Sequence, residues 1–561
     1  MRKYGVLEFN GKLWRVRDLT PPCAMMFKRL FPRVQTGATV HLMADSPALR
    51  ADLLWFMERW PLQTKHHNRL KSGVRDMRDQ EKVIDAILAD ESWRPSGASG
   101  FRDGMEPWLY QSQAAAMTLA TGRLLLADDV GLGKTISSFA TMCMGAPDTL
   151  PAAVVVQPHL AEQWKKRLEQ FTDLSCGVID TRLPHPRDGT PDVTIFRYSN
   201  IAGWSDTMAG AGYRSCFFDE MQEVRHGAET AKGAACAVLA DMCQYRMGLT
   251  ATPIYNYGSE IWNVMQYLDP GILGTWDEFI REWCIQGRIV RDPDALGEYL
   301  RECNAMLRRT EHDVDKSMPP PNVVMQAVPW DASVFHENSA HVQELAKLVL
   351  SGSFQQSGMA ARELDAKLRQ ATGVAKSRAV AAYARMLLET GGVEKLILAG
   401  WHREVWEIWQ EVLSDFNPAM YTGTETTARK NRNIERFCEG DARILMLSLR
   451  SGAGVDGLER YCDDVMVGEF DWSPQVHKQI VGRVRRGGKS RQVNVYYPYV
   501  EEGSDPVLME VNGIKADQAR GINDPGQALP EQHRDESRVK MLAQSVLSRE
   551  AKDDEQPETV H

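Results

Sequence analysis

The chain has 561 residues and a formal net charge of −9, with 43% hydrophobic and 25% charged residues. This length predicts more than one domain, since roughly 100–200 residues per domain is usual, and the composition is that of a globular protein in water. The apolar runs fall short of the ~20 residues that a membrane helix needs, and the first residues lack the apolar core of a signal peptide. We therefore expect a cytoplasmic protein without a membrane partner, nucleoid-associated if its source is a bacterium or a phage.

The negative charge is concentrated in the C-terminal part of the chain. Residues 501–561 hold 14 acidic and 7 basic side chains, which leaves the preceding residues with a charge of only −2. A nearly neutral body can hold a basic groove, so the net charge does not exclude a nucleic-acid partner. We predict that residues 501–561 are an acidic extension, disordered from about residue 531, where the chain is charged and short of aromatic side chains.

The ten cysteines are scattered, and no two of them form a C-x-x-C pair. Two interpretations stay open: reduced thiols inside packed elements, or a zinc site assembled from residues distant in the sequence. The first is favoured, because no local spacing points to a metal.

The first 104 residues predict a small α+β accessory domain followed by a linker. Asn10-Gly11 stands between two alternating segments and is a two-residue hairpin signal. Ser46-Pro47 supplies a cap and a first-turn proline for a helix. The basic segment 65–78 is either a solvated helix face, which we favour, or a phosphate contact. Residues 91–104 are rich in Gly, Pro and Ser, as is typical of a linker.

Residues 123–140 read RLLLADDVGLGKTISSFA, which predicts a strand, a glycine loop and the start of a helix. The loop amides and the helix dipole suit nucleotide phosphates. Lys134 would reach the β- and γ-phosphate oxygens, and Thr135 would ligate Mg²⁺. The alternative is an ordinary glycine-rich turn, because Asp128 stands where the strict phosphate-loop pattern has glycine.

Gln111 precedes Lys134 by 23 residues, ahead of a segment rich in Ala and Met that predicts a helix. A glutamine amide both donates and accepts hydrogen bonds, so it suits the edge of an adenine. On its own Gln111 would be an unremarkable surface residue, and its position before the glycine loop is what makes it a candidate nucleotide contact.

Two apolar stretches, the first at 152–157, predict buried parallel strands. The second, CFFDE, ends in Asp219 and Glu220. In a nucleotide hydrolase Asp219 would hold Mg²⁺ through water and Glu220 would polarise the attacking water, although such a pair also occurs by chance. A further short strand precedes Thr250 and Thr252. Their hydroxyls either link the carboxylates to DNA or form a simple turn.

Residues 257–390 are mostly helical by pattern, with Trp, Met and Leu at helical spacing. Within them, Arg308 and Arg309 have two interpretations that the sequence leaves equal. They are either structural residues or contacts to a nucleic-acid backbone.

A second α/β pattern has strands at 395–399 and 442–448. Trp401, Trp406 and Trp409 follow the first of these strands at a spacing that suits a packed helix face. We therefore interpret the three tryptophans as core residues rather than as base-stacking groups.

A glycine-rich loop, residues 450–457, follows the second of these strands and permits the close approach of a backbone or ligand. Further on, the segment after Pro474 predicts a helix that holds Gln479, Arg483 and Arg486. Arginines three residues apart lie on one helix face, so the last two can point the same way. In isolation such a run is more often a surface or phosphate patch than a catalytic pair.

Taken in order, these signals resemble the motif series of superfamily-two helicases, and more closely the Swi/Snf-like DNA translocases. Typical of that branch are the acidic residues before GLGKT, the TATPIYN stretch, the LRRT…DV…MPP stretch and WSPQ followed by Q-x-x-G-R-x-x-R. Residues 370–400 look like the annealing-helicase and the stand-alone bacterial or phage members. The resemblance covers roughly residues 105–500.

The resemblance implies an α/β fold of two RecA-like parallel-sheet lobes with helical protrusions, and ATP and Mg²⁺ as cofactors. Gln111 would contact adenine, Glu220 would be the catalytic base, and Arg483 and Arg486 would be arginine fingers of the second lobe. Further nucleotide contacts would be Asp128, Gly131, Gly133, Lys134, Thr135 and Asp456, with Thr135 and Asp219 on the metal. DNA contacts would be Pro158, His159, Gln163, Trp164, Thr250, Thr252, Arg450, Gly452 and Gly454. Gln222 and Gln479 would couple nucleotide and DNA.

The chain departs from the family pattern in three places. Met-Gln follows Asp219-Glu220 where relatives have Ala-His, so Gln222 must relay what histidine usually does, and we expect activity to survive. The stretch after Pro158 is one residue shorter than usual. The final motif reads RVRRGG where relatives often carry a histidine and Ile-Gly-Gln.

The predicted domain organisation follows from these patterns. It comprises an accessory domain and linker (1–104), the ATP-binding lobe (105–256), helical protrusions (257–390), the second lobe (391–500) and the C-terminal extension (501–561).

The resemblance implies an ATP-hydrolysing motor that tracks double-stranded DNA independently of sequence and remodels or anneals it, or displaces bound proteins. Two alternatives remain: a strand-separating DNA or RNA helicase, and a nucleotide-gated DNA-binding protein without turnover. No protein partner is identified by the sequence.

Overall fold

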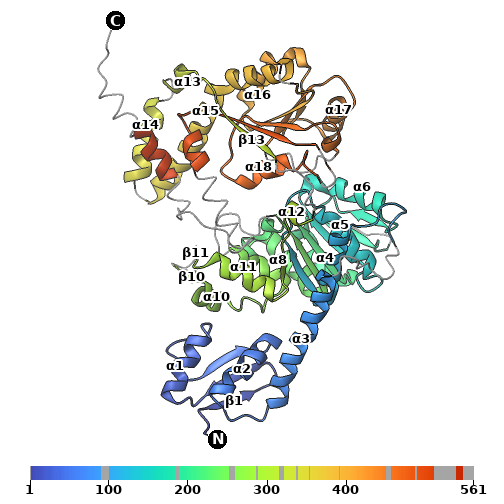
Figure 1. The fold of residues 1–561 in the computed structure, drawn as a ribbon, viewed down its shortest axis with the longest axis vertical. Helices are drawn as coiled ribbons and strands as arrows, with labels where there is room; N and C mark the ends of the chain where they lie inside the picture. Colours follow the sequence, from blue (N-terminus) through green and yellow to red (C-terminus); the bar gives the residue numbers. More distant parts are fainter. Residues whose placement is uncertain are drawn as a thin grey trace. The chain divides into compact units, whose positions relative to one another are not determined.

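The computed structural model describes residues 2–89, 100–184, 189–251, 260–285, 289–314, 321–336, 339–352, 354–390, 392–449, 457–486, 489, 491–510 and 539–547. It divides into two compact units (Figure 1). Unit 1 comprises residues 1–128 and 133–308, and unit 2 is built mainly from residues 309–520. The predicted segment 257–390 is therefore shared between the two units.

The N-terminal module, residues 2–89, begins unit 1. Three strands within it form an antiparallel sheet, and the third of them was not predicted. Its elements are β1 (Val6–Phe9), β2 (Leu13–Arg17), α1 (Pro21–Leu30), β3 (His41–Ala44), α2 (Pro47–Arg59) and α3 (His67–Ala89). The predicted hairpin is confirmed, with Asn10 Oδ1 accepting from the N–H of Lys12 and Leu13, and so is the helix start, where Ser46 Oγ accepts from Leu49 N–H.

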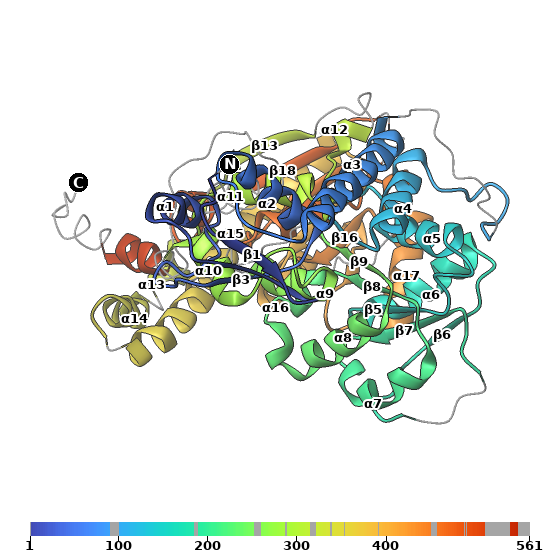
Figure 2. The same ribbon diagram turned by 90° about the horizontal axis from the view of Figure 1, so that it is seen from below.

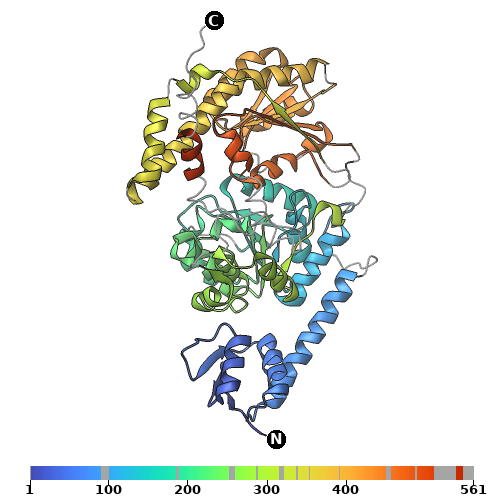
Figure 3. The same ribbon diagram turned by 60° about the vertical axis from the view of Figure 1, so that its left-hand side comes forward.

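The long helix α3 leads from the module into the rest of unit 1 (Figure 3). Its last turn packs there, since Ile84 and Ile87 are buried in the same apolar cluster as α4. Gln113 Nε2 also donates to the carbonyl of Ile87 (2.9 Å). Lys71, Arg75 and Arg78 on α3 are exposed, which fits both interpretations of the basic segment, a solvated helix face and a phosphate contact.

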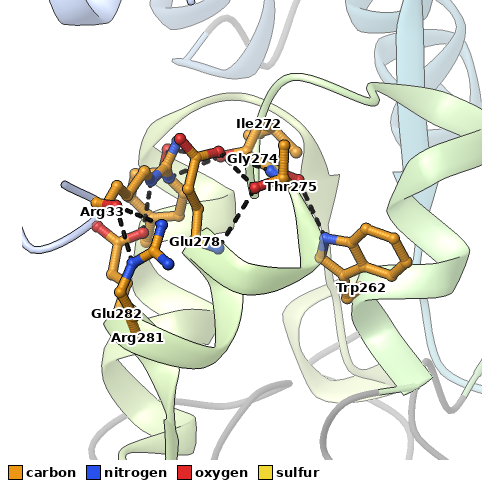
Figure 4. A network of polar contacts seen from close by, with 9 residues as sticks. Arg33, Trp262, Ile272, Gly274, Thr275, Glu278, Arg281 and Glu282 are labelled. Carbon is orange, nitrogen blue, oxygen red and sulfur yellow. Dashed lines mark hydrogen bonds and ion pairs between the residues drawn. The ribbon is translucent and has the colours of Figure 1, made fainter. Parts of the chain in front are cut away.

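Arg33 ties the module to the helical part of unit 1 (Figure 4). Its guanidinium donates to Glu282 Oε2 (2.6 Å), to the carbonyl of Ile272 (2.9 Å) and to Tyr299 Oη (3.2 Å). In return, Arg281 donates twice to the Arg33 carbonyl (3.0 and 2.7 Å). Because a guanidinium donates through several N–H groups held in one plane, these hydrogen bonds fix the orientation of the module on α10 as well as its distance.

In the described part of unit 1, seven strands form one parallel sheet in the order β12-β4-β9-β8-β5-β7-β6. Their bounds are β4 (Arg123–Leu126), β5 (Ala152–Val156), β6 (Cys176–Val178), β7 (Val193–Arg197), β8 (Ser215–Asp219), β9 (Tyr245–Leu249) and β12 (Met306–Leu307). The strands are short apolar runs, as expected for a sheet that is covered on both faces.

Helices cover both faces of this sheet (Figure 2). They are α4 (Leu109–Thr121), α5 (Lys134–Met144), α6 (Ala161–Phe171), α7 (Ser205–Met208), α8 (Ala231–Met242), α9 (Glu260–Leu268), α10 (Trp276–Trp283) and α11 (Pro293–Glu302). Val154 belongs to the apolar cluster that includes residues of α4, α5 and α6, whereas its neighbour Val155 belongs to the cluster that includes residues of α8 to α11, as strand alternation requires. A two-stranded ribbon, β10 (Cys284–Ile285) and β11 (Ile289–Val290), follows α10.

Unit 2 holds a second all-parallel sheet, with six described strands in the order β13-β18-β17-β14-β16-β15. Their bounds are β13 (Asn322–Ala327), β14 (Leu396–Gly400), β15 (Ala419–Tyr421), β16 (Ile444–Ser448), β17 (Asp464–Val467) and β18 (Asn494–Tyr499). The strand β13 lies in the segment predicted to be helical, and it pairs in parallel with β18. The predicted fold of two parallel-sheet lobes is confirmed.

The helices of unit 2 are α12 (Glu311–Val314), α13 (Ala332–His336), α14 (Ser339–Ser351), α15 (Phe354–Thr390), α16 (Arg403–Val412), α17 (Thr427–Cys438) and α18 (Pro474–Val481). Trp406 and Trp409 of α16 are buried as predicted, but Trp401 is 38% exposed. The prediction that Trp401 is a core residue is wrong. Helix α16 begins only at Arg403, so Trp401 lies before the helix and not on the face that buries Trp406 and Trp409.

The prediction of disorder from about residue 531 is wrong for residues 539–547, which are helical. Leu542 and Ala543 are fully buried against α14 and α15. Val539, Leu542, Ala543 and Val546 recur at the spacing of one helix face, a signal that the charged composition around them obscures.

None of the helices in the described ranges combines the length and apolar character that a bilayer crossing requires. All ten cysteines are free thiols, and the described residues contain no group of three His, Cys, Asp or Glu side chains placed to hold a metal ion. Seven of the ten thiols are buried, which fits the interpretation of thiols in packed elements.

Candidate nucleotide-binding site

The glycine loop leaves the carboxyl end of β4 and opens helix α5, in the predicted strand–loop–helix order. Gly131 and Gly133 have φ values of 95° and 67°, a conformation that side chains with a Cβ rarely adopt. Lys134, the first residue of α5, donates from Nζ to the carbonyl of Asp128 (2.8 Å). The loop thus turns its backbone around a lysine at a helix N-terminus, which is the arrangement that binds phosphate groups.

Gln111 lies directly against this loop. A Cβ on Gly133 would lie 2.7 Å from Gln111 Nε2, so only glycine leaves room for the amide there. Gln111 Oε1 accepts from Trp108 N–H (2.9 Å), which fixes the orientation of the amide at the start of α4. The sequence placed these residues 22 positions apart, and the structure brings them into contact.

The strands β4, β9 and β8 are neighbours, so the loop, Thr250 and the pair Asp219-Glu220 meet at one edge of the sheet. Burial and the adjacent Glu220 carboxylate raise the pKa of Asp219, and the Trp164 hydrogen bond and the charge of Lys134 oppose that rise. Trp164 Nε1 donates to Asp219 Oδ2 (2.8 Å). This edge thus holds a carboxylate that can bind Mg²⁺, and a lysine and a phosphate-type loop that can bind the phosphates of ATP.

A chain of side-chain hydrogen bonds joins the carboxylates to the end of β9. Gln222 Nε2 donates to Glu220 Oε2 (2.6 Å), and Gln222 Oε1 accepts from Thr250 Oγ1 (2.8 Å). Glu220 itself has φ 47° and ψ 59°, a left-handed conformation that is strained for a glutamate. The amide of Gln222, which we predicted as the relay in place of histidine, thus contacts both Glu220 and Thr250.

We expect Gln222→Ala to lower DNA-stimulated ATP turnover about tenfold, with a change of less than about twofold in KM for ATP. The lost hydrogen bond to a carboxylate is worth about 1.5–3 kcal/mol, and about 1.4 kcal/mol corresponds to tenfold in rate. Gln222→His, which can also donate and accept, should restore at least half of the rate. Steady-state ATPase assays measure both values, with Gln244→Ala, at the opposite end of β9, as the control. Unchanged turnover in Gln222→Ala would contradict the relay.

Two of the predicted DNA contacts are corrected by their burial. Trp164 is only 3% exposed and packs edge-on against Phe139, so it orients Asp219 instead of contacting DNA. Thr250 is 1% exposed, and its hydroxyl is directed to Gln222. Both predictions failed because the spacing of a motif does not reveal which of its side chains face the interior.

Other predicted DNA contacts lie at the surface. Pro158 and His159 form an exposed turn after β5, and Gln163 is half-buried on α6. The remaining candidates, Thr252, Arg450, Gly452, Gly454 and the nucleotide candidate Asp456, lie outside the described residues.

The predicted arginine helix ends earlier than its sequence implied. Helix α18 runs only to Val481, with Gln479 in its last turn, so Arg483 and Arg486 lie in the turns that follow. The N–H of Arg483 donates to the carbonyl of Ile480 (3.0 Å), a spacing of three that tightens and ends an α-helix. The argument that the two arginines share one helix face is therefore wrong, and their placement depends on turn geometry.

Lys489 braces these turns and was missed by the sequence analysis. Its Nζ donates to the carbonyl of Val484 (2.9 Å), to the carbonyl of Glu459 (2.8 Å) and to Asp463 Oδ1 (2.6 Å). Arg486 Nε lies 4.0 Å from Glu459 Oε2. No local pattern reveals such a lysine, because two of its three partners, Glu459 and Asp463, lie more than 20 residues away along the chain.

Two further residues, distant in the sequence, support the backbone of the site at the ends of β4 and β8. Arg308 Nη1 donates to the carbonyl of Ala127 (2.8 Å), which favours the structural interpretation of this arginine. Tyr198 Oη donates to the carbonyl of Asp219 (2.9 Å). Sequence reasoning had no signal for Tyr198.

The model of the SNF2-related domain family matches residues 69–372, more than half of the chain. The chain belongs to the SNF2-related domain family. The predicted Swi/Snf-like, superfamily-two family is confirmed.

Two curated proteins illustrate the similarity of this SNF2-family chain to others. The DNA annealing helicase and endonuclease ZRANB3 of Mus musculus is 25% identical over 420 residues, which cover 70% of this chain and 38% of that protein. The SWI/SNF-related matrix-associated actin-dependent regulator of chromatin subfamily A-like protein 1 of Xenopus tropicalis is 24% identical over 402 residues, with coverages of 69% and 42%. The chain thus spans about two fifths of the length of these relatives.

Among solved structures, the Sulfolobus solfataricus SWI2/SNF2 ATPase core in complex with dsDNA is 19% identical to this SNF2-family chain. The match covers 77% of this chain and 96% of that chain, with a TM-score of 0.37.

Proposed function

We propose that this SNF2-family chain is an ATP-dependent translocase on double-stranded DNA, which couples ATP hydrolysis to DNA remodelling, annealing or displacement of bound proteins. The observation that carries the proposal is the meeting of Lys134, Asp219 and Glu220 at the carboxyl ends of β4 and β8, with β9 between these two strands. The names of the relatives support the choice of DNA, since they include an annealing helicase and an ATPase core solved with dsDNA.

In this proposal, each residue of the edge has a separate task. The loop amides and Lys134 hold the β- and γ-phosphates, Thr135 and Asp219 face the metal, and Glu220 accepts a proton from the attacking water. Bound Mg²⁺ would supply charge neutralisation at the phosphates. Arg483 and Arg486 of unit 2 are assigned to the transferring phosphoryl group, as the resemblance implies.

The relay Glu220–Gln222–Thr250 gives the coupling a physical route. A shift of the segment after β9 on binding DNA would move the Thr250 hydroxyl, and the amide would pass that change to the Glu220 carboxylate. Turnover should therefore depend on nucleic acid. Translocation should depend on salt and little on sequence, because the backbone phosphates are the same at every base pair.

The deciding experiment is the ATPase rate of the full chain with duplex DNA, single-stranded DNA, forked DNA and RNA. We expect duplex DNA to stimulate turnover most, and independently of its sequence. Stimulation by RNA alone would overturn the DNA assignment. Absence of turnover with every nucleic acid would favour a nucleotide-gated binding protein, and strand separation on the fork would favour a helicase.

A further inference from the structure

The N-terminal module has a charge opposite to that of the rest of the chain. Residues 1–89 contain 16 Lys and Arg against 9 Asp and Glu, a net charge of +7, whereas residues 90–561 carry −16. A positively charged domain on an acidic protein attracts polyanions locally and is not explained by solubility. The family model begins at residue 69, so most of this module lies outside the family's domain.

Part of this charge is used inside the module, and part is not. Asp45 accepts from both Arg50 and Arg69 (2.6 and 2.5 Å), which ties the start of α3 to α2. By contrast, Lys71, Arg75 and Arg78 are exposed and have no carboxylate within ion-pair distance among the residues that the structure describes. The module therefore separates structural arginines from cations that face solvent.

These three cations form a line, here called the basic stripe. Intervals of four and three residues place Lys71, Arg75 and Arg78 on one side of α3, because residues three and four apart are neighbours on a helix. The adjoining side packs Leu70 and Gly73 against the module, and a Cβ on Gly73 would lie 2.5 Å from Arg50 Cβ. The helix cannot rotate the stripe away from solvent without losing this packing.

The basic stripe continues at the N-terminal end of α3 toward the β1–β2 turn. The His66 ring lies 6.0 Å from the rings of both Phe9 and Trp14, which brings the turn beside the helix start. Lys12 in the turn and Lys65 before the helix are both exposed. The stripe itself, from Lys71 to Arg78, is about 10 Å long at 1.5 Å per residue.

We propose that the basic stripe binds the sugar–phosphate backbone of duplex DNA, as a second DNA contact separate from the motor sheet. About 10 Å spans three base-pair steps of B-DNA, a length that offers four phosphates on one strand, so each of the three cations can reach a phosphate. The stripe carries no aromatic side chain on which unpaired bases would stack, so a duplex backbone suits it better than single strands. The inference rests on the proposed function, which brings duplex DNA to this chain.

The Arg33 contacts give this DNA contact a consequence for the motor. Because Arg33 and Arg281 hold the module on α10 and α11 of unit 1, DNA bound at the stripe stays attached to the unit that contains Lys134 and Glu220 (Figure 4). We expect a second DNA contact on unit 1 to slow the dissociation of the duplex and to leave the rate of ATP hydrolysis unchanged.

The test compares the full chain with the triple variant Lys71→Gln, Arg75→Gln and Arg78→Gln. The matched control is Lys347→Gln, Arg362→Gln and Arg432→Gln, three exposed cations on helices of unit 2. Binding of fluorescently labelled duplex DNA is measured between 50 and 200 mM salt. We expect the slope of log Kd against log salt to fall by about 2–3 in the stripe variant, at about 0.9 per phosphate contact, and to stay unchanged in the control.

Equal slopes in the stripe variant and the wild type would overturn the inference. A loss confined to duplex RNA of the same length would overturn it as well. The ATPase rate at saturating duplex DNA should be that of the wild type, which shows that the variant is folded. Wild-type protein that neither binds duplex DNA nor is stimulated by it would instead refute the proposed function, so the two failures are distinguishable.

Discussion

Replacing Glu220 by Gln should lower kcat for ATP hydrolysis by about 10²–10⁴-fold, the usual contribution of a positioned general base. The amide has the shape of the carboxylate and still accepts the Gln222 hydrogen bond, but it cannot take a proton from water. Nucleotide binding should therefore remain within about threefold of the wild type. Single-turnover hydrolysis and fluorescent-nucleotide titration measure the two quantities.

Glu223→Gln is the matched control for this variant. Glu223 lies three residues further on and accepts from Lys232 (2.7 Å) and Gln157 (3.2 Å), away from the relay. We expect its kcat to stay within about threefold of the wild type. Turnover by Glu220→Gln within tenfold of the wild type would remove Glu220 from the role of base.

Replacing Lys134 by Ala should weaken ATP binding at least about 100-fold and reduce turnover to background. The ammonium is the cation at the phosphate loop, and charge-assisted contacts to phosphate are roughly twice as strong as neutral ones. The variant also loses the hydrogen bond from Nζ to the Asp128 carbonyl, so the loop loses a brace. DNA binding without nucleotide should persist.

Isothermal titration with ATP and a duplex-binding assay test this variant together. Lys166→Ala, an exposed lysine on α6, is the control and should bind ATP as the wild type does. Wild-type ATP affinity in Lys134→Ala would show that the loop does not hold the phosphates. Loss of DNA binding as well would point to a folding defect, which a thermal melt would detect.

The strand, the glycine loop and the helix start of the site could be predicted, because they are formed by consecutive residues. Leu124 to Leu126 form a strand, Gly131 and Gly133 adopt conformations that favour glycine, and Lys134 begins a helix. Each of these features depends on neighbours within a few positions, where backbone preferences act directly.

Contacts between distant segments could not be predicted in the same way. The strand β13 was assigned to a helical region, because its apolar run, Val323 to Met325, is too short for its periodicity to distinguish a strand from a helix. Trp164 and Thr250 were interpreted as DNA contacts, but they are bonded inside the site to Asp219 and Gln222. In both cases the partner is set by which strands lie side by side.

By itself, then, the sequence determined the family, the two parallel-sheet lobes and the chemical groups of the nucleotide site. Only the tertiary structure decided that β9 lies between β4 and β8, although it follows both in the chain. That order brings Thr250 to Gln222 and Gln222 to Glu220, and it places the carboxylates beside the loop that holds Lys134. Backbone preferences act over a few residues, whereas strand order is set by burying apolar surface across the whole sheet.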